Sequence, residues 1–433
     1  MVNRLDIVIF GATGYTGKLL VKNAIHMCKD QNLKFGIAGR RKGALEAVIQ
    51  EFASDNEIIP IILADVNDEE SLHKMTKQTK ILINCCGPYR FYGEPVVKAC
   101  IATCTHYIDV TAEQQFMEHM QIKYNTAAKE AGVYIVCACG FDCIPTDLGI
   151  IFTQQQFEEV NSVEVYMKIW FTRCILPFIR PKGSYISYGT WDSAVHMLGH
   201  RNELQELHRK LYSNANLPEL TPKLKSRGIH RSDVSEGWSM SVPSADRAVA
   251  CRTQYFLHTK YNDRPAQIQF YATFKYFYEF LMIAIAGIFL LILSRLSCCR
   301  KLLLKHPALF TAGFISRKNS NLDENQKTVR FDTTIVAHGW TEKLAESNDQ
   351  HTNPPNKKVI AKVSGESPYE MTSVVAILSA ATILNEIDKI PDNGGVLTPG
   401  AAFGRTSLIE QMDKHNIKFE IISADVYNHK EIV

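Results

Sequence analysis

The sequence has no strong excess of charge of either sign. It holds 48 lysines and arginines against 45 aspartates and glutamates, which leaves a formal net charge of +3 over 433 residues. Nucleic-acid-binding domains usually carry a strongly basic surface, so such a surface would have to be local here. We therefore expect no nucleic-acid partner.

The twelve cysteines lack the regular spacing of a disulfide framework. They fall within predicted strands and helices, as the thiols of a cytosolic enzyme do. The N-terminus also lacks the apolar run of a secretory signal, because Asp6 interrupts it and a glycine turn follows. We expect no secretory signal and a reducing compartment.

The composition, with 46% hydrophobic and 21% charged residues, is that of a folded protein. The length exceeds what one ordinary core accommodates, so we expect more than one domain. We place a dinucleotide-binding domain at residues 1–145 and an α+β domain at 146–390, with a C-terminal segment at 391–433 that packs back on the first domain.

Three glycines spaced three apart end the first apolar run, Leu5 to Phe10. This pattern predicts a buried strand that turns into a helix whose first amides are free to bind phosphate. The spacing is looser than the G-x-G-x-x-G fingerprint of dinucleotide sites. We assign cofactor binding to the residues of this turn, Gly11, Thr13, Gly14, Tyr15, Thr16 and Gly17.

Short apolar runs and helix-like segments then alternate as far as Ala138. This alternation predicts a doubly wound parallel sheet with right-handed crossovers. Ligands of such sheets lie across the carboxyl ends of the strands, so the residues at each strand exit are the candidates for binding and catalysis.

The second predicted strand ends at Arg40, Arg41 and Lys42, where a cofactor with a free ribose 2′-hydroxyl would usually meet an acidic residue. Cations favour a 2′-phosphate, so Arg40 and Arg41 predict NADP(H) in preference to NAD(H). The alternative is a solvated basic helix start. Asp65 ends the third strand, either at the adenine edge or as a helix cap before Glu69.

The next strand exits should face the nicotinamide half of the cofactor. We assign Cys86, Gly87 and Pro88 to cofactor binding. The candidates for proton transfer are Tyr89, Asp109 and Asp142. Structural alternatives remain open for all three: Tyr89 would stack on the nicotinamide or line the cleft, Asp109 would cap a helix, and Asp142 would hold the adjacent glycine turn.

Three thiols, Cys137, Cys139 and Cys143, lie within seven residues. Zinc requires four converging ligands, and no second Cys or His pair stands nearby. We therefore predict buried cysteines and no metal.

An uncharged apolar segment, Phe280 to Leu293, stands out in the second domain. As a helix it would be about 21 Å long, short of the ~30 Å hydrocarbon core, so we expect monotopic or re-entrant insertion rather than a span. The alternative is a core helix. The membrane-associating region would cover residues 271–315, with basic residues that meet anionic lipid downstream, namely Arg295, Arg300, Lys301 and Lys305.

Cys298 and Cys299, beside the apolar segment, are candidate palmitoylation sites.

Other parts of the second domain carry weaker signals. Residues Asn161 to Phe171 alternate, which predicts a half-solvated antiparallel strand. Another strand is predicted from Gln254 to His258, preceded by Arg247 and Arg252, which could clamp a carboxylate or phosphate.

Four stretches resemble the saccharopine dehydrogenase-like oxidoreductases of animals. They are the strand and turn at 8–17, the turn at 84–89, the turn at 140–147 and Gly394 to Gly404. The resemblance runs nearly end to end. It implies a Rossmann cofactor domain, a second domain shared with saccharopine reductases, and association with lipid droplets or other membranes.

The sequence therefore predicts an NAD(P)H-dependent oxidoreductase that acts on a lipidic or hydrophobic substrate at a lipid droplet or at the cytosolic face of a membrane. The alternative is a lipid-droplet surface protein that binds NADP without turnover. Saccharopine metabolism is a third hypothesis, although that substrate needs a polar pocket. The second domain would hold the substrate and is the candidate surface for a homodimer.

Overall fold

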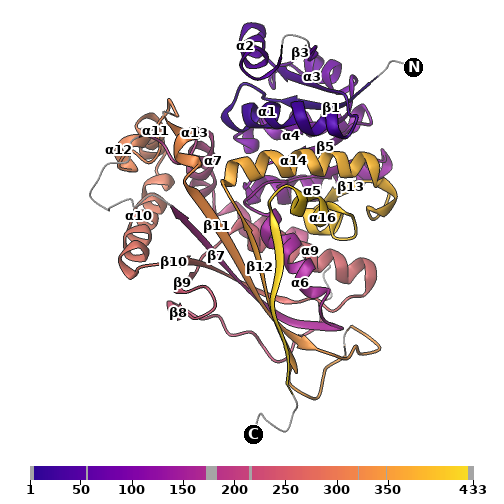
Figure 1. Cartoon of the computed structure of the whole chain (residues 1–433), viewed down its shortest axis with the longest axis vertical. Helices are drawn as coiled ribbons and strands as arrows, with labels where there is room; N and C mark the ends of the chain where they lie inside the picture. Colours follow the sequence, from indigo (N-terminus) through magenta and orange to yellow (C-terminus); the bar gives the residue numbers. More distant parts are fainter. Residues whose placement is uncertain are drawn as a thin grey trace.

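The computed structural model describes residues 4–54, 57–171, 183–213, 217–319, 321–347 and 349–427. These residues form two seven-stranded sheets, and Figure 1 shows helices lying between them. The N-terminal sheet lies at the top of that view, and the described chain ends at the foot of the second sheet.

The first sheet is parallel throughout and runs in the order β13-β6-β5-β4-β1-β2-β3. The predicted doubly wound sheet is confirmed, and β13 adds a strand to it. Strand order reverses between β1 and β4, where such folds bind dinucleotides. The strands are β1 (Leu5–Phe10), β2 (Phe35–Gly39), β3 (Ile61–Leu63), β4 (Thr79–Asn84), β5 (His106–Asp109), β6 (Tyr134–Val136) and β13 (Gly395–Leu397).

Helices cover both faces of this sheet, which is why Ile7, Val8 and Ile9 of β1 are all fully buried whichever face they point to. The helices between its first strands are α1 (Tyr15–Asp30), α2 (Lys42–Phe52), α3 (Glu69–Thr76), α4 (Tyr89–Ala102) and α5 (Gln114–Glu130).

The second sheet is mixed and runs in the order β14-β12-β11-β7-β10-β9-β8. Its centre is β7 (Glu159–Phe171), which pairs in parallel with β10 and antiparallel with β11. The prediction of a half-solvated strand was wrong for its first eight residues, which are all buried. The loop before β8 covers the second face, where Arg227 pairs with Glu164 at 2.6 Å. The other strands are β8 (His230–Ser232), β9 (Gly237–Ser241), β10 (Gln267–Phe274), β11 (Val329–Trp340), β12 (Lys357–Gly365) and β14 (Lys418–Val426).

A layer of helices joins the two sheets. Among them α14 packs against α1 and β4 of the cofactor domain. The predicted strand Gln254 to His258 was wrong, because these residues belong to α9, whose N-terminus Ser244 caps. The layer comprises α6 (Ile144–Gln154), α9 (Ala245–Tyr261), α14 (Pro368–Asn385), the 3-10 helix η1 (Ile387–Lys389), α15 (Pro399–Phe403) and α16 (Leu408–Lys414).

The C-terminal segment divides between the two sheets. β13 pairs with β6 of the first sheet, as the predicted return to the cofactor domain requires. That prediction was wrong for β14, which pairs antiparallel with β12 at the edge of the second sheet. A strand adds to a sheet where an edge strand has unpaired backbone N–H and C=O groups. Without β14, β12 would be such an edge strand.

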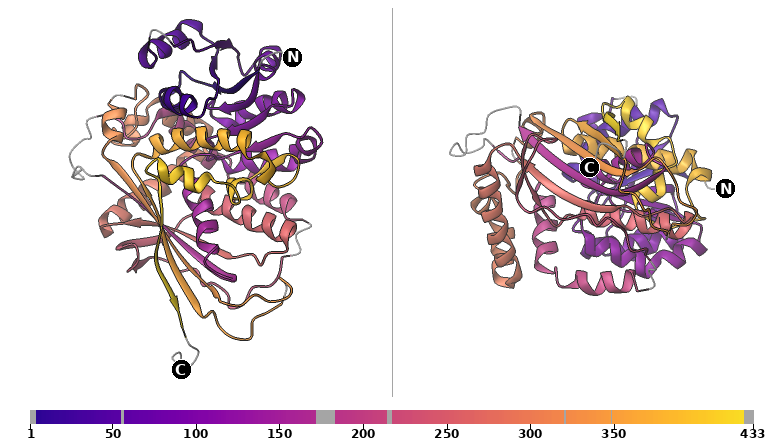
Figure 2. Two further views of the ribbon diagram at one scale, coloured as in Figure 1. Left: turned by 45° about the vertical axis from the view of Figure 1, so that its right-hand side comes forward. Right: turned by 90° about the horizontal axis from the view of Figure 1, so that it is seen from below.

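The remaining helices gather at one side of the molecule. Figure 2 shows α10 standing apart from both sheets when the molecule is seen from below. On its inner side α10 contacts α7 and α11. The group comprises α7 (Tyr188–Gly199), α8 (Glu203–Leu211), α10 (Phe277–Arg295), α11 (Ser297–Lys305), α12 (Pro307–Phe310) and α13 (Leu322–Gln326).

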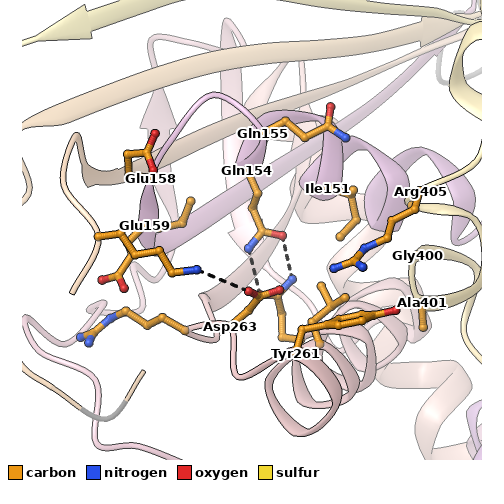
Figure 3. A pocket seen from close by; sticks show the side chains of 16 residues that line it. Ile151, Gln154, Gln155, Glu158, Glu159, Tyr261, Asp263, Gly400, Ala401 and Arg405 are labelled. Carbon is orange, nitrogen blue, oxygen red and sulfur yellow. Dashed lines mark hydrogen bonds and ion pairs between the residues drawn. The ribbon is translucent and has the colours of Figure 1, made fainter. Parts of the chain in front are cut away.

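A cavity of about 270 Å³ lies between the C-terminal ends of α6 and α9 and the short helix α15. Figure 3 shows its lining, in which Lys343 pairs with Asp263 at 3.9 Å and the amides of Gln154 and Gln254 bond to each other. Charges of both signs therefore offset one another here. The cavity lies at the far end of α6 from the turn at Asp142.

Candidate functional site

The glycine turn after β1 is built for close backbone packing. Gly11 has φ +85°, and a Cβ there would lie 2.9 Å from the Cys86 sulfur. A Cβ at Gly17 would overlap the carbonyl oxygen of Gly11. A Cβ at Gly14 would meet only that same oxygen, at 3.3 Å, and Gly14 is exposed. Gly11 and Gly17 thus shape the turn, whereas Gly14 keeps its outer side open.

The N-terminus of α1 is available for an anion. Gly14 is its N-cap, no side chain caps the helix, and its first turn holds no acidic residue. Thr13 and Thr16 flank this end and are only partly buried. An uncapped helix N-terminus with a glycine opening is the usual cradle of a pyrophosphate, so these residues fit a dinucleotide cofactor.

Tyr15 points away from this cradle toward the second domain. Its ring meets that of Tyr369 edge to face, with centroids 5.1 Å apart. Burial, together with Asp323, raises the pKa of its phenol. The backbone of Tyr15 thus belongs to the anion-binding turn, while its side chain fixes the turn against α14 and α13.

The exits of β2 and β3 carry the predicted polar groups. Arg40 and Arg41 are exposed, and neither forms an ion pair with any residue that the structure describes. Asp65 accepts hydrogen bonds from the backbone and side chain of Asn67, at 3.0 and 3.2 Å. The helix-cap alternative for Asp65 was wrong, because Asp68 caps α3 through the amides of Glu70 and Ser71.

The exit of β4 meets the glycine turn, since the Cys86 sulfur lies beside the position of a Gly11 Cβ. Cys86 donates its amide to the Asn84 side chain at 3.0 Å, and burial raises the pKa of its thiol to about 12. Gly87 and Pro88 continue from it into α4. The turns at 11–17 and 86–88 therefore form one edge of the sheet, as predicted.

The hydroxyl of Tyr89 is buried beneath the exit of β4 and is already engaged there. The side chain is 6% exposed, packs against Phe116 and donates its hydroxyl to the carbonyl of Asn84 at 2.9 Å. Burial also raises the pKa of the Tyr89 phenol well above its ordinary value. The geometry therefore contradicts a proton-donor role for Tyr89 and gives it a place in the core.

Glu113 was missed as a site residue. Its carboxylate is 3% exposed and accepts hydrogen bonds from the backbone amides of Tyr89 and Arg90, at 2.8 and 2.9 Å. Glu113 therefore caps the N-terminus of α4, although it lies more than twenty residues further along the chain. It also accepts the hydroxyl of Ser193 in α7 at 2.7 Å. This cap joins two distant segments, which is why no local sequence signal identified it.

Asp109 lies fully buried at the end of β5. It accepts the amides of Thr111 and Ala138 at 3.1 and 2.9 Å and the hydroxyl of Tyr107 at 2.9 Å. Burial raises its pKa to about 6 despite these donors. These bonds join the end of β5 to the residue that follows β6, so the arrangement favours a clip between the two strands over proton transfer.

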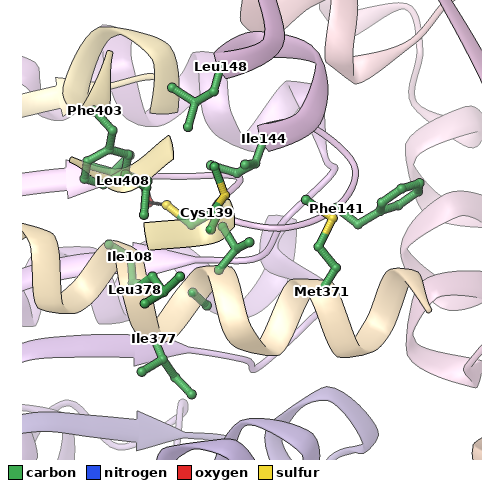
Figure 4. Close-up of a cluster of buried hydrophobic side chains, with 14 of the residues drawn as sticks. Ile108, Cys139, Phe141, Ile144, Leu148, Met371, Ile377, Leu378, Phe403 and Leu408 are labelled. Carbon is green, nitrogen blue, oxygen red and sulfur yellow. Dashed lines mark hydrogen bonds between the residues drawn. The ribbon is translucent and has the colours of Figure 1, made fainter. Parts of the chain in front are cut away.

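Asp142 is the predicted acid that stays accessible. Cys139, Phe141 and Ile144 on either side of it point into the core against Met371 of α14 (Figure 4). Its own side chain is exposed, yet it stands deep enough between the domains that desolvation raises its pKa to about 6. A carboxyl group that is both reachable and easily protonated is suited to general acid catalysis.

A second carboxyl group faces Asp142. Asp246 of α9 is 8% exposed and accepts hydrogen bonds from Ser244 and Thr146. Burial, together with the charge of Asp142, raises the pKa of Asp246 to about 7. Burial therefore makes both carboxyl groups easier to protonate, and the charge of Asp142 adds to this effect at Asp246. The sequence analysis missed Asp246.

Asp147, one turn further along, has a structural task. It accepts the Gly400 amide at 2.6 Å and the Thr253 hydroxyl at 2.8 Å, so it ties α6 to α15 and α9. A Cβ at Gly400 would lie 2.7 Å from this carboxylate. The 140–147 and 394–404 stretches thus contact each other through Asp147 and Gly400.

The predicted arginine clamp does not form. Arg252 is 4% exposed and donates to the Gln121 side chain at 2.7 Å, whereas exposed Arg247 donates to the carbonyl of Ile268 at 2.9 Å. On a helix these positions do not face the same way, and the predicted strand was the reason to pair them. The predicted buried cysteines are confirmed for Cys137, Cys139 and Cys143.

The apolar segment forms α10, and the core-helix alternative was wrong. Within this 19-residue helix only Phe280 and Ser294 are buried. It is long and apolar enough to cross a membrane by length and composition. Seven large apolar side chains of this segment are exposed, namely Leu281, Met282, Ile283, Ile285, Ile288, Phe289 and Ile292.

Replacing Gly14 tests the anion cradle directly. We expect Gly14→Val to weaken NADPH binding by about tenfold or more, because a side chain there holds the pyrophosphate away from the amides of α1. Its thermal midpoint should stay close to that of the parent, since Gly14 has open space. Gly228→Val is the control, because nothing lies within 4 Å of a Cβ there. Fluorescence titration with unchanged NADPH affinity for Gly14→Val would contradict the cradle.

Comparison with known proteins agrees with this geometry. The saccharopine dehydrogenase NADP-binding domain model matches residues 7–136. A saccharopine dehydrogenase-like oxidoreductase of Rattus norvegicus is 36% identical over 97% of each chain, and the lipid droplet localized protein of Caenorhabditis elegans is 30% identical over 98% of this chain and 99% of its own. In fold, saccharopine dehydrogenase (L-Glu forming) from Saccharomyces cerevisiae matches 97% of this chain and 100% of its own with TM-score 0.53 at 12% identity. The chain therefore belongs to the saccharopine dehydrogenase-like oxidoreductases and carries their NADP-binding domain.

Proposed function

We propose that the chain is an NADPH-dependent oxidoreductase that acts on a lipidic substrate while docked on a lipid droplet or a membrane. The observation that carries the proposal is α10, an apolar helix in which only Phe280 and Ser294 are buried, in a chain with a dinucleotide-binding domain. Soluble proteins rarely expose an apolar surface of this extent unless it has a partner. The name of the C. elegans relative supports a lipid partner.

The shape of the α10 region favours one leaflet over a span. A 19-residue helix is roughly 28 Å long, close to the ~30 Å hydrocarbon core. However, β10 before it belongs to the second sheet, and α11 after it packs back on α7. Both ends of α10 thus return to the same folded body, which argues for insertion from one side.

The apolar side chains of α10 supply enough transfer free energy to insert the helix into lipid. Eleven large apolar residues lie between Phe280 and Leu293. At about −0.3 to −0.6 kcal/mol each, they favour entry into lipid by roughly 3 to 7 kcal/mol. Tyr276, Phe277 and Tyr278, all about half exposed, precede them and suit the headgroup boundary. Cys298 at the other end is also exposed, in keeping with the proposed palmitoylation.

The residues at the strand exits have separate tasks in this proposal. The turn from Gly11 to Gly17 holds the pyrophosphate, and Arg40 and Arg41 hold the 2′-phosphate. NADPH, when bound, supplies a hydride to an electrophilic carbon. Asp142 donates a proton from its carboxyl group to the substrate, and desolvation raises the pKa of that carboxyl to about 6, so that it is protonated in mildly acidic solution.

The preference for NADPH can be tested at the β2 exit. We expect Arg40→Ser/Arg41→Ser to weaken NADPH binding about ten- to a hundredfold, which corresponds to the loss of charge-assisted hydrogen bonds to phosphate, and to leave NADH binding unchanged. Lys42→Ser is the control, because Lys42 pairs with Glu46 at 3.7 Å. Calorimetric titration that shows equal losses for both cofactors would remove the basis for the preference.

Turnover is tested by NADPH oxidation in the presence of lipid extracts. We expect Asp142→Asn to lower kcat about 10²- to 10⁴-fold without changing NADPH affinity. Because a carboxyl with pKa about 6 donates only when protonated, kcat of the parent should fall as pH rises through 6. The exposed Asp233→Asn is the control. Tight NADPH binding with no oxidation by any extract would favour the lipid-droplet surface protein without turnover.

Docking is tested with two charges on the outer side of α10. We expect Ile285→Asp/Phe289→Asp, both more than half exposed, to lose at least about tenfold in binding to phospholipid-coated triacylglycerol emulsions. Ile58→Asp, 95% exposed elsewhere, should bind like the parent. Deletion of Phe280 to Leu293 should release the protein from droplets in cells, measured by fractionation. Persistent association of both altered proteins would refute docking through α10.

A further inference from the structure

We infer that a second cavity, at the C-terminal end of α10, binds the phosphate headgroup of an anionic phospholipid. This inference rests on the proposed docking of α10. The cavity has a volume of about 440 Å³ and lies where three elements meet: the start of α5, the helix α8 and the last residue of α10. Its polar lining consists of Gln114, Arg201, Asn202, Gln205, His208 and Arg295.

Two guanidinium groups converge on this cavity from separate elements. Arg201 precedes α8, and Arg295 ends α10. Neither forms an ion pair with any residue in the described part of the chain, whereas the nearby arginines are engaged: Arg90 pairs with Glu203 at 3.0 Å, and Arg300 donates to the Ser294 carbonyl at 2.9 Å. A guanidinium group that has no carboxylate partner can donate two parallel hydrogen bonds to phosphate oxygens.

The acidic groups near the cavity are already bonded. Glu118 is fully buried, and one of its oxygens accepts the Gln114 amide at 2.8 Å and lies 3.3 Å from His208. Glu203 is held by Arg90, and Glu206 pairs with Lys210 at 2.7 Å. The second oxygen of Glu118 has no partner in the described chain but is shut off from solvent. The cavity therefore presents two arginines without carboxylate partners together with amide side chains, a combination that suits an anion.

The position of the cavity selects a lipid headgroup over a soluble phosphate. Arg295 directly follows the apolar residues of α10, so it reaches headgroup level when those residues enter the acyl layer. The volume exceeds what a bare phosphate ion occupies and leaves room for the rest of a headgroup. The apolar helix and the cavity would then contact adjacent parts of the same lipid layer.

The test uses the full chain and triacylglycerol emulsions coated with phosphatidylcholine, alone or mixed with phosphatidylinositol. We expect Arg201→Gln/Arg295→Gln to lose roughly tenfold of the preference for the mixed surface, in line with the loss of two charge-assisted contacts. Its binding to the neutral surface should equal that of the parent. The control, Arg209→Gln/Lys318→Gln, removes the same two charges at exposed positions outside the cavity lining and outside the 271–315 region and should lose less than about twofold.

Four results would overturn the assignment. Equal losses in both double variants would mean diffuse attraction between a basic surface and anionic lipid, and no loss in either would leave the cavity without a ligand. Inorganic phosphate that abolishes the preference at millimolar concentration would identify a soluble phosphate compound as the occupant. Release of every protein, the parent included, from the neutral surface would contradict docking through α10 itself, and the headgroup assignment would fall with it.

Discussion

The contact between two backbones in the glycine turn is the constraint on which the cofactor domain depends. The first turn of α1 can pack on the end of β1 only because Gly17 has no side chain to overlap the Gly11 carbonyl. That packing directs the free amides of α1 to the switch point between β1 and β4. The Cys86 sulfur closes the other side of Gly11, so the exits of two neighbouring strands form one continuous edge.

Helix α7 connects this edge with the surface proposed to meet lipid. On one side Ser193 donates to Glu113, whose carboxylate caps α4. On the other side Trp191 donates to the Leu303 carbonyl of α11 and packs in the small cluster that supports α10. A single helix thus contacts both the cofactor edge and the support of the apolar helix.

Local sequence patterns predicted the structure correctly where residues that are close in sequence are also close in space. The strand-turn-helix at Gly11 and the alternation up to Ala138 predicted the first sheet, since each βα unit is made from consecutive residues. The absence of charge from Phe280 to Leu293 likewise predicted the exposed helix α10. The same reasoning failed for Gln254 to His258, because helix and strand are difficult to distinguish in short, weakly patterned stretches.

The sequence by itself determined the parallel sheet, the glycine cradle, the basic β2 exit and the apolar helix, because each depends on residues a few positions apart. Only the tertiary structure decided which strand-exit residues are free to act. Tyr89 and Asp109 are engaged by groups from other strands, Asp142 is left accessible, and Asp246 is brought to it from a helix about one hundred residues away. Burial and hydrogen-bond partners are set by packing between distant segments, and these decide whether a polar side chain supports the fold or can perform chemistry.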